Sequence, residues 1–200
     1  MKPIFAKGMC VSDRVAIAKE GECLGDLVVP TGCIGLATVC SIVINGTLLK
    51  AGIPIDSRFG GILQIRNGKP LRFAELIHYT GTSLDPSEVL IKAGMTSIKD
   101  AVNKADGKIL ANFREMPALC RPVAEEVLRK LRKSGINGLL LLGNTSEPAC
   151  EIIVKSNRIG MILYGGLNPV GAAVESGIEI ETHAMSTMME YQKLIEIREL

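Results

Sequence analysis

The residues that could do chemistry in this 200-residue chain are arginines and hydroxyl-bearing residues placed where predicted strands and turns end. Arg58 follows a short apolar segment in SRFGG, and Arg114 ends the segment KILANFRE. Strand ends in open α/β sheets face ligand crevices, and the fork of an arginine can bind both oxygens of a carboxylate. The turns around Thr82–Ser83 and Thr96–Ser97 offer hydroxyl donors, although such residues also cap helices. A lone arginine is more often simply solvated, so the carboxylate site is a hypothesis.

The elements that must position these residues follow from an internal repeat. Residues 22–57 and 147–182 share one pattern at a constant offset of 125 residues and without a gap. The residues that recur are Glu22 and Glu147, Val29 and Val154, Ile34 and Ile159, Gly35 and Gly160, Gly52 and Gly177, Ile53 and Ile178, and Ile55 and Ile180. Self-similarity of this length indicates one supersecondary unit used twice. Two such units facing each other would form two lobes around a cleft.

Each copy predicts the same succession of elements. Strands are expected at 27–29 and 34–39 in the first copy and at 152–154 and 159–164 in the second, because these segments are short and aliphatic. A helix follows and ends at Gly52 or Gly177, and last strands are expected at 53–55 and 178–180. This order is typical of βαβ geometry, which predicts an α/β fold with mixed sheets and helices.

The segment 58–115 between the copies is predicted as an insertion with elements of its own. A β-hairpin is expected from 61–66 and 71–79 about the turn Asn67-Gly68-Lys69-Pro70. Helices are expected at 87–93, behind the cap Asp85-Pro86, and at 96–104, followed by a strand at 108–114. Residues 118–133 have the apolar spacing of an amphipathic helix. The first copy lacks most of the matching helix, so we expect the chain to be one two-lobed domain, 1–200, of a longer protein.

The strand-to-helix turn differs between the copies, because Cys40-Ser41 aligns with Gly165-Gly166. A chain that turns from a strand into a helix exposes free N–H groups at the positive end of the helix dipole, where an anion can bind. Asn168-Pro169 would cap and open the second helix. The alternative explanation for the two glycines is close packing of the helix on the sheet.

Covalent and metal chemistry find less support. Cys40 lies near a predicted helix N-terminus, which would lower its pKa and make it a conceivable nucleophile, but no partner base is marked nearby. His78 and His183 are isolated, and no Cys/His cluster has the spacing of metal ligands. No catalytic residue, metal or cofactor is therefore predicted, and an enzyme acting on a small keto or amino acid through Cys40 stays the alternative.

Composition limits the partners of the chain. It carries 23 Lys and Arg against 21 Asp and Glu, a formal charge of +2, with 4% aromatic residues and no Trp. This balance argues against direct binding of nucleic acid or membranes by these residues. The six cysteines form no CxxC pair, which is typical of reduced thiols in a cytoplasmic protein.

Several long strings resemble one family. They are VSDRVAIAKEGE (11–22), TVCSIVINGTLLKAGIPIDSRFGG (38–61), HYTGTSLDPSEVLIKAGMTS (78–97), ILANFREMP (109–117) and GGLNPVGAAVESGIEIETHAMS (165–186). Together they are similar to the regulatory domain of NrpR, the euryarchaeal repressor of nitrogen-assimilation genes. The resemblance implies an archaeal, cytoplasmic sensor, not an enzyme, whose effector 2-oxoglutarate relieves DNA binding. It also implies a homodimer that contacts DNA through a winged-helix domain absent from these residues.

The implied ligand agrees with the candidate residues. A dicarboxylate with a keto group needs cationic forks or helix-terminal amides at its ends and hydroxyl donors between them. The residues expected to supply these groups are Ser41, Arg58, Thr82, Ser83, Thr96, Ser97, Arg114, Gly165, Gly166 and Asn168.

Overall fold

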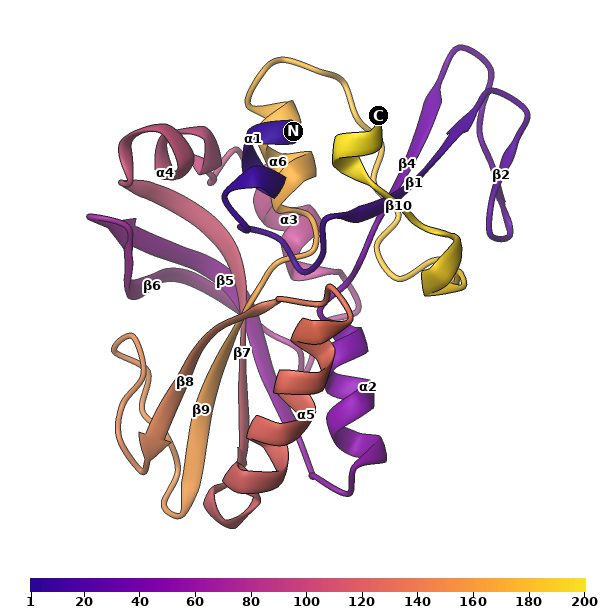
Figure 1. Cartoon of the computed structure of the whole chain (residues 1–200). Coiled ribbons are helices and arrows are strands. Elements are labelled where there is room, and N and C mark those ends of the chain that lie inside the picture. The colour runs from indigo at the N-terminus through magenta and orange to yellow at the C-terminus, as the bar shows by residue number, and fades with distance from the viewer.

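The computed structural model describes all residues, 1–200, and its largest element is a five-stranded antiparallel sheet (Figure 1). The strand order is β6-β5-β7-β9-β8. The strands are β5 (Asp56–Arg66), β6 (Lys69–His78), β7 (Gly107–Pro117), β8 (Leu139–Thr145) and β9 (Arg158–Tyr164). The six α-helices are α1 (Lys2–Ala6), α2 (Ile42–Lys50), α3 (Pro86–Lys92), α4 (Ile98–Lys104), α5 (Arg121–Lys133) and α6 (Asn168–Val174). None of them has the length and apolar content needed to cross a lipid bilayer.

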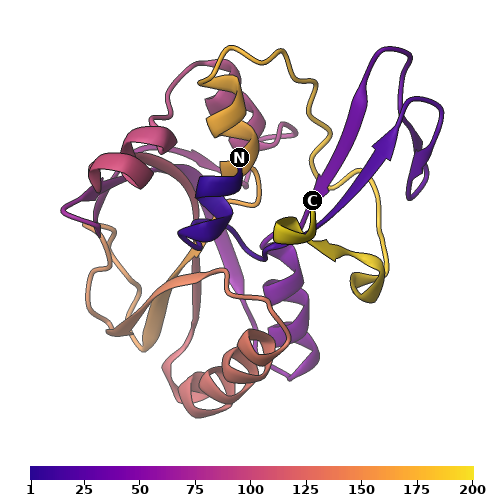
Figure 2. The ribbon, with the colours of Figure 1, turned by 45° about the horizontal axis from the view of Figure 1, so that its top comes forward.

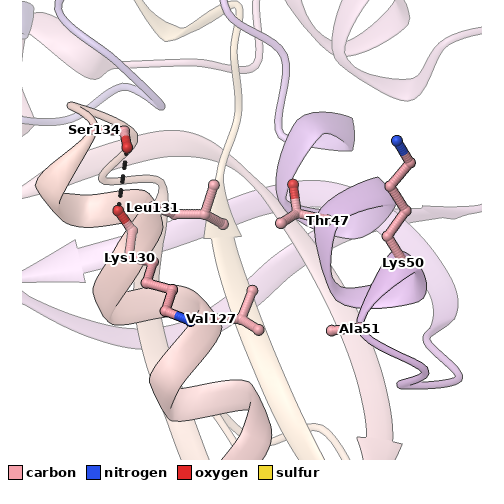
Figure 3. Close-up of a pocket in the computed structure, with 7 residues that line it drawn as sticks. All are labelled: Thr47, Lys50, Ala51, Val127, Lys130, Leu131 and Ser134. Atoms are coloured by element: carbon pink, nitrogen blue, oxygen red, sulfur yellow. Dashed lines mark hydrogen bonds between the residues drawn. The ribbon is translucent and has the colours of Figure 1, made fainter.

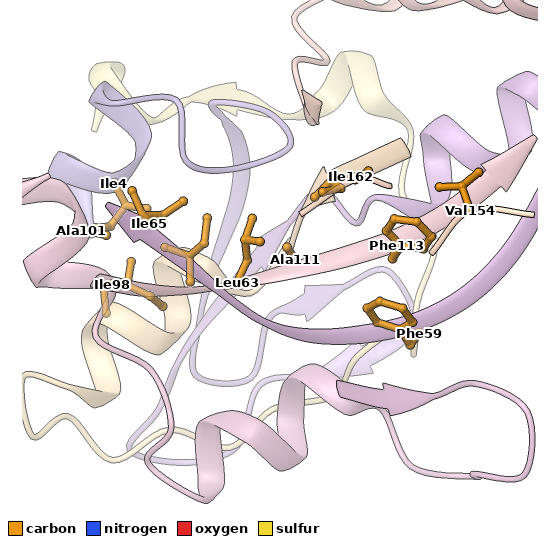
Figure 4. Packing of buried hydrophobic residues seen from close by; sticks show 13 residues of the cluster. Ile4, Phe59, Leu63, Ile65, Ile98, Ala101, Ala111, Phe113, Val154 and Ile162 are labelled. Carbon is orange, nitrogen blue, oxygen red and sulfur yellow. The ribbon is translucent and has the colours of Figure 1, made fainter. Parts of the chain in front are cut away.

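The central strand β7 has helices packed on both of its faces, which explains why eight of its eleven residues are buried. Ile109, Ala111 and Phe113 enter a cluster that also holds residues of α1, α4 and α6 (Figure 4). Within that cluster the rings of Phe59 and Phe113 stack at 5.1 Å. The alternate residues of β7 face the other way, because side chains along a strand alternate between faces.

The opposite face of the sheet carries two separate apolar clusters. Met116 packs with residues of α2 and α5, while Leu110 packs with residues of α3. Between these two positions on the same face lie Asn112 and Arg114, which are polar and buried. The sheet therefore buries a polar stripe between two apolar regions, and this stripe positions the site described below.

A smaller three-stranded sheet extends away from the body as an arm (Figures 1 and 2). It consists of β1 (Arg14–Lys19), β4 (Ile34–Thr38) and β10 (Ile195–Glu196), in the order β10-β1-β4. The short strands β2 (Cys23–Leu24) and β3 (Leu27–Val28) pair with each other near the outer end of this arm. The arm joins the body where β4 leads into α2.

The α/β class is confirmed, as are several local predictions. The hairpin forms as β5 and β6, and both Asn67 and Gly68 have the positive φ angles, 50° and 72°, that a two-residue hairpin turn requires. Asp85 caps α3 by accepting hydrogen bonds from the backbone N–H groups of Ser87 and Glu88. The strand at 108–114 and the helices within 96–104 and 118–133 are also present, as β7, α4 and α5.

The expected parallel crossovers were wrong. Every strand pair is antiparallel, and β4 and β5 belong to different sheets, so the succession β4-α2-β5 is not a βαβ unit. Residues 53–55 and 178–180 are not strands, and residues 152–154 form only an isolated bridge at Ile152. Ile53 lies in a loop, and its side chain packs in the core between α2 and α5. Ile178 is 55% exposed. In each copy the middle strand and its helix are nevertheless present in the expected order, as β4-α2 and β9-α6.

Candidate functional site

The strand-to-helix turns of the two sequence copies meet at a cavity of about 230 Å³. Thr38, Cys40 and Ser41 line it from the first turn, and Gly166 and Leu167 line it from the second. The Thr38 hydroxyl donates a hydrogen bond to the Gly166 carbonyl oxygen at 3.0 Å, so the turns are in direct contact. The two turns therefore share one cavity, whereas the two-lobed repeat with a common structure stays a prediction.

Glycine at 166 permits this contact. A Cβ atom there would lie 2.8 Å from the carbonyl oxygen of Val39, so a side chain would push the turns apart. The backbone N–H groups of Cys40, Ser41, Gly166 and Leu167 make no hydrogen bond within the chain. Two sets of free donors therefore border the cavity, as expected where strands turn into helices.

A chain of polar side chains crosses the cavity. They come from the start of β5, the residue after β6, strand β7 and the residue before α2. The Tyr79 hydroxyl donates to Oδ1 of Asn112 at 2.6 Å, and Nδ2 of Asn112 donates to Oγ of Ser41 at 3.1 Å. The Arg114 guanidinium donates to the same Ser41 oxygen at 3.3 Å and to Oγ of Ser57. These bonds fix the orientation of each group before a ligand arrives, which lowers the entropic cost of binding.

Arg114 is a buried cation without an anionic partner. It is 4% exposed, no carboxylate lies within 4.0 Å of it, and its Nε atom makes no hydrogen bond. Burial lowers the pKa of Arg114, while nearby Tyr79 and Cys40 act in the opposite direction. Because a buried charge is costly unless it is paired, an unpaired guanidinium on a cavity wall is suited to an anionic ligand.

Tyr79 is a hydrogen-bond donor at neutral pH. Burial raises its pKa to about 12; Arg114 lowers the pKa, whereas Asp85 and Cys40 raise it. The hydroxyl therefore stays protonated and keeps its bond to Asn112 throughout the physiological range. Ser57, Tyr79 and Asn112 were missed by the sequence analysis. Asn112 and Arg114 are two residues apart in an otherwise apolar strand, so their side chains lie on the same face. This spacing was the signal that could have indicated a polar site on β7.

Arg58 lies outside the cavity. It is the extra residue of a β-bulge, since Ser57 faces Arg114 and Phe59 faces Phe113 across the β5–β7 ladder. Its guanidinium donates to Oε1 of Glu115 at 2.5 Å on the face of the sheet opposite Arg114. The sequence hypothesis treated both arginines as site residues, but the structure separates them.

The remaining candidates are also placed away from the cavity lining. Thr82 accepts a hydrogen bond from the N–H of Leu84 within its own loop, which also contains Ser83. Ser97 accepts from the N–H of Lys108, and Thr96 precedes it. The start of α4 is capped instead by Glu175, whose carboxylate accepts from the N–H groups of Ile98 and Lys99.

Gly165 and Asn168 attach the second turn to β7. The Gly165 N–H donates to the Leu110 carbonyl oxygen, and a Cβ on this glycine would lie 2.6 Å from that of Leu110. Asn168, which is fully buried, accepts from the Leu110 N–H at 2.8 Å and donates to its carbonyl oxygen at 3.1 Å. Close packing of the helix on the sheet therefore explains the glycine at 165. Gly166, in contrast, lines the cavity.

A second, more open groove of about 330 Å³ lies between α2 and α5 (Figure 3). Thr47 and Lys50 line one side, and Val127, Lys130 and Leu131 line the other. Lysines near the last turns of helices interact favourably with the helix dipole, so their presence here needs no ligand. The groove lacks the buried unpaired charge that distinguishes the first cavity.

One known protein family matches nearly the whole chain. The family described as NrpR regulatory domains NRD1 and 2 matches residues 1–196. The chain belongs to the NrpR regulatory-domain family. The resemblance that the sequence strings indicated is thereby confirmed.

Individual relatives support the NrpR assignment. The chain is 42% identical over 190 residues to the global nitrogen regulator NrpRI of Methanosarcina mazei, covering 95% of this chain and 58% of that protein. It is 30% identical over 200 residues to the global nitrogen regulator NrpR of Methanocaldococcus jannaschii, covering all of this chain and 33% of that protein. The chain therefore spans between one third and three fifths of the length of these NrpR relatives.

A solved structure shares the fold. The crystal structure of a nitrogen repressor-like protein from Methanococcus jannaschii matches with a TM-score of 0.77 and 30% sequence identity. The match covers 98% of this chain and 79% of that one. The NrpR relatives are named as regulators, which gives no support to the enzyme alternative through Cys40.

Proposed function

We propose that this NrpR domain binds 2-oxoglutarate in the cavity around Arg114, and that binding relieves repression of nitrogen-assimilation genes. The observation that carries the proposal is the unpaired, buried Arg114 guanidinium on the wall of a cavity. An arginine fork binds both oxygens of a carboxylate, and the interaction strengthens where water is excluded. Membership of the NrpR family supports nitrogen status as the signal.

The rest of the cavity complements the remainder of such a ligand. The free N–H groups of the two turns can donate hydrogen bonds to the second carboxylate of the ligand. The hydroxyls of Ser41, Ser57 and Ser87 line the same cavity and are suited to a keto oxygen. A volume of about 230 Å³ lies below the range of drug-sized pockets, which is consistent with a small metabolite.

We also propose that the domain works within a cytoplasmic homodimer whose DNA contacts come from a winged-helix domain outside these residues. The small net charge of +2 supports a sensing rather than a DNA-binding role for this segment. The greater length of the NrpR relatives leaves room for such a domain.

Isothermal titration of the purified chain with 2-oxoglutarate tests the proposal. We expect saturable binding of one ligand per chain, and weaker binding of glutarate, which has both carboxylates but no keto oxygen. Equal affinities would show that the keto group is not recognised. Absence of binding by either dicarboxylate would contradict the proposal.

Replacing Cys40 with serine separates effector binding from the enzyme alternative. We expect Cys40→Ser to bind 2-oxoglutarate within about twofold of the unmodified chain, because a hydroxyl replaces a thiol that makes no hydrogen bond here. Titration measures the affinity, and a screen of small keto and amino acids measures turnover. Turnover that is present in the unmodified chain and lost in Cys40→Ser would favour the enzyme instead.

A further inference from the structure

The cavity that contains Arg114 also contains a carboxylate. Asp85 lies between β6 and α3 and lines the cavity together with Ser87. Its Oδ1 atom accepts from the N–H groups of Ser87 at 2.9 Å and Glu88 at 3.1 Å, whereas its Oδ2 atom makes no hydrogen bond. No lysine or arginine lies within 4.0 Å of this carboxylate. The only groups that bind this carboxylate directly are therefore the two N–H groups at the start of α3.

Asp85 and Arg114 are opposite charges on the wall of one cavity. The two side chains form no ion pair, although both line the same cavity. Tyr79 lies within the electrostatic influence of both, since Arg114 lowers its pKa and Asp85 raises it. The cavity therefore has a positive pole at Arg114 and a negative pole at Asp85, with the Tyr79 hydroxyl in the field of each.

A cavity with one positive and one negative wall distinguishes a ligand with an ammonium group next to its carboxylate from one with an uncharged oxo group there. A 2-oxo dicarboxylate carries two negative charges, so Arg114 attracts one end while Asp85 repels the ligand as a whole. The 2-amino counterpart carries an additional ammonium group, which Asp85 attracts. The geometry points to Asp85 as the residue that sets the preference between oxo acid and amino acid, so that glutamate competes with 2-oxoglutarate for this cavity. The inference rests on the proposed function and adds a competing ligand to it.

The conservative variant Asp85→Asn isolates the charge. Asparagine caps helices about as well as aspartate, so α3 should keep its N-terminal hydrogen bonds. Removing one like charge several ångströms away in a partly buried site should tighten 2-oxoglutarate binding by about tenfold. The same change should weaken L-glutamate binding by about tenfold, because its ammonium group loses its partner.

Titration of 2-oxoglutarate and L-glutamate into the unmodified chain and into Asp85→Asn measures both shifts. Asp106→Asn is the matched control, because Asp106 is exposed and accepts from the N–H of Asn67 at the far end of β7. Opposite shifts for the two ligands in Asp85→Asn, with none in Asp106→Asn, would support the inference. Shifts in the same direction, or no shift, would overturn it.

A comparison on the unmodified chain needs no variant. Glutarate and L-glutamate differ only by the amino group, so glutamate should bind about tenfold more tightly than glutarate. Weaker binding of glutamate would overturn the inference even if Asp85→Asn failed to fold. If 2-oxoglutarate binds but either glutamate comparison gives the contrary result, the inference fails while the proposed function stands. If no dicarboxylate binds, the proposed function itself fails.

Discussion

Replacing Arg114 with methionine should weaken 2-oxoglutarate binding by at least about 30-fold without destabilising the ligand-free protein. Methionine matches the length of the arginine stem and can fill the same buried space, but it cannot form charge-assisted hydrogen bonds. Losing one member of a buried, hydrogen-bonded charge pair costs about 2–5 kcal/mol of binding free energy, a decrease in affinity of roughly 30-fold to several thousand-fold. Because the guanidinium is buried without an anion in the ligand-free protein, its removal should leave the melting temperature unchanged or higher.

Arg58→Met is the matched control for Arg114→Met. It removes an arginine from the same region of sheet, but from the opposite face, where Arg58 binds Glu115. We expect this control to keep its affinity for 2-oxoglutarate and to melt at a lower temperature. Full affinity in Arg114→Met would exclude Arg114 from the binding site, and a large loss of its stability would indicate a structural role instead.

Replacing Glu115, the residue after Arg114, should have the opposite effects. We expect Glu115→Ala to lose stability and to keep its affinity for 2-oxoglutarate. The Glu115 side chain is fully buried between two arginines, with Arg58 Nη1 at 2.5 Å and Arg158 Nε at 3.3 Å. Breaking a buried ion pair costs about 3–5 kcal/mol, and the lower end applies here because both arginines are 24% exposed and can reach water. In a chain of this size about 3 kcal/mol corresponds to a fall in melting temperature of roughly 6–12 °C.

Chemical denaturation of Glu115→Ala, Arg58→Met and the unmodified chain measures this effect. Arg58→Met should lose less stability than Glu115→Ala, because Arg158 still contacts the carboxylate. A Glu115→Ala variant as stable as the unmodified chain would show that the two arginines gain as much from water as from the carboxylate. Affinity is measured well below the melting temperature, so that the folded fraction is the same in each sample.

The sequence predicts local structure correctly where one or two residues determine the backbone conformation. Asn67-Gly68 predicted the hairpin because few residue pairs accept two consecutive positive φ angles. Asp85-Pro86 predicted the start of α3, since the cap and the fixed proline φ act within a few residues. The family strings added the affiliation, which local rules alone do not supply.

Strand pairing could not be read in the same way. The segments around Ile53 and Ile178 have strand-like composition, but one enters the core as a loop and the other is exposed. Hydrophobic composition reports burial, and the choice between a parallel crossover and two separate antiparallel sheets depends on partners far away in the sequence.

A shift of one residue in the pairing of β5 with β7 determines which arginine faces the cavity. Both arginines were predicted as site residues. Arg114 lines the cavity, whereas the bulge after Ser57 places the Arg58 side chain on the opposite face of the sheet. A slip of one residue exchanges the faces of a strand, and the sequence carries no direct mark of a bulge. Tyr79 and Asn112 were missed for a similar reason, because their proximity arises from the pairing of β5 with both β6 and β7.

The attachment of the arm has a geometric consequence. Strand β4 ends at Thr38, which touches the second turn at the cavity, and begins at Ile34, farther out along the arm. Ile34 lies four residues before Thr38, a distance of roughly 13 Å along a strand, so a rotation of about 10° about the Thr38 end would move Ile34 by about 2 Å. A change in the direction of β4 at its contact with Gly166 would therefore produce its largest displacement at the outer end of the arm.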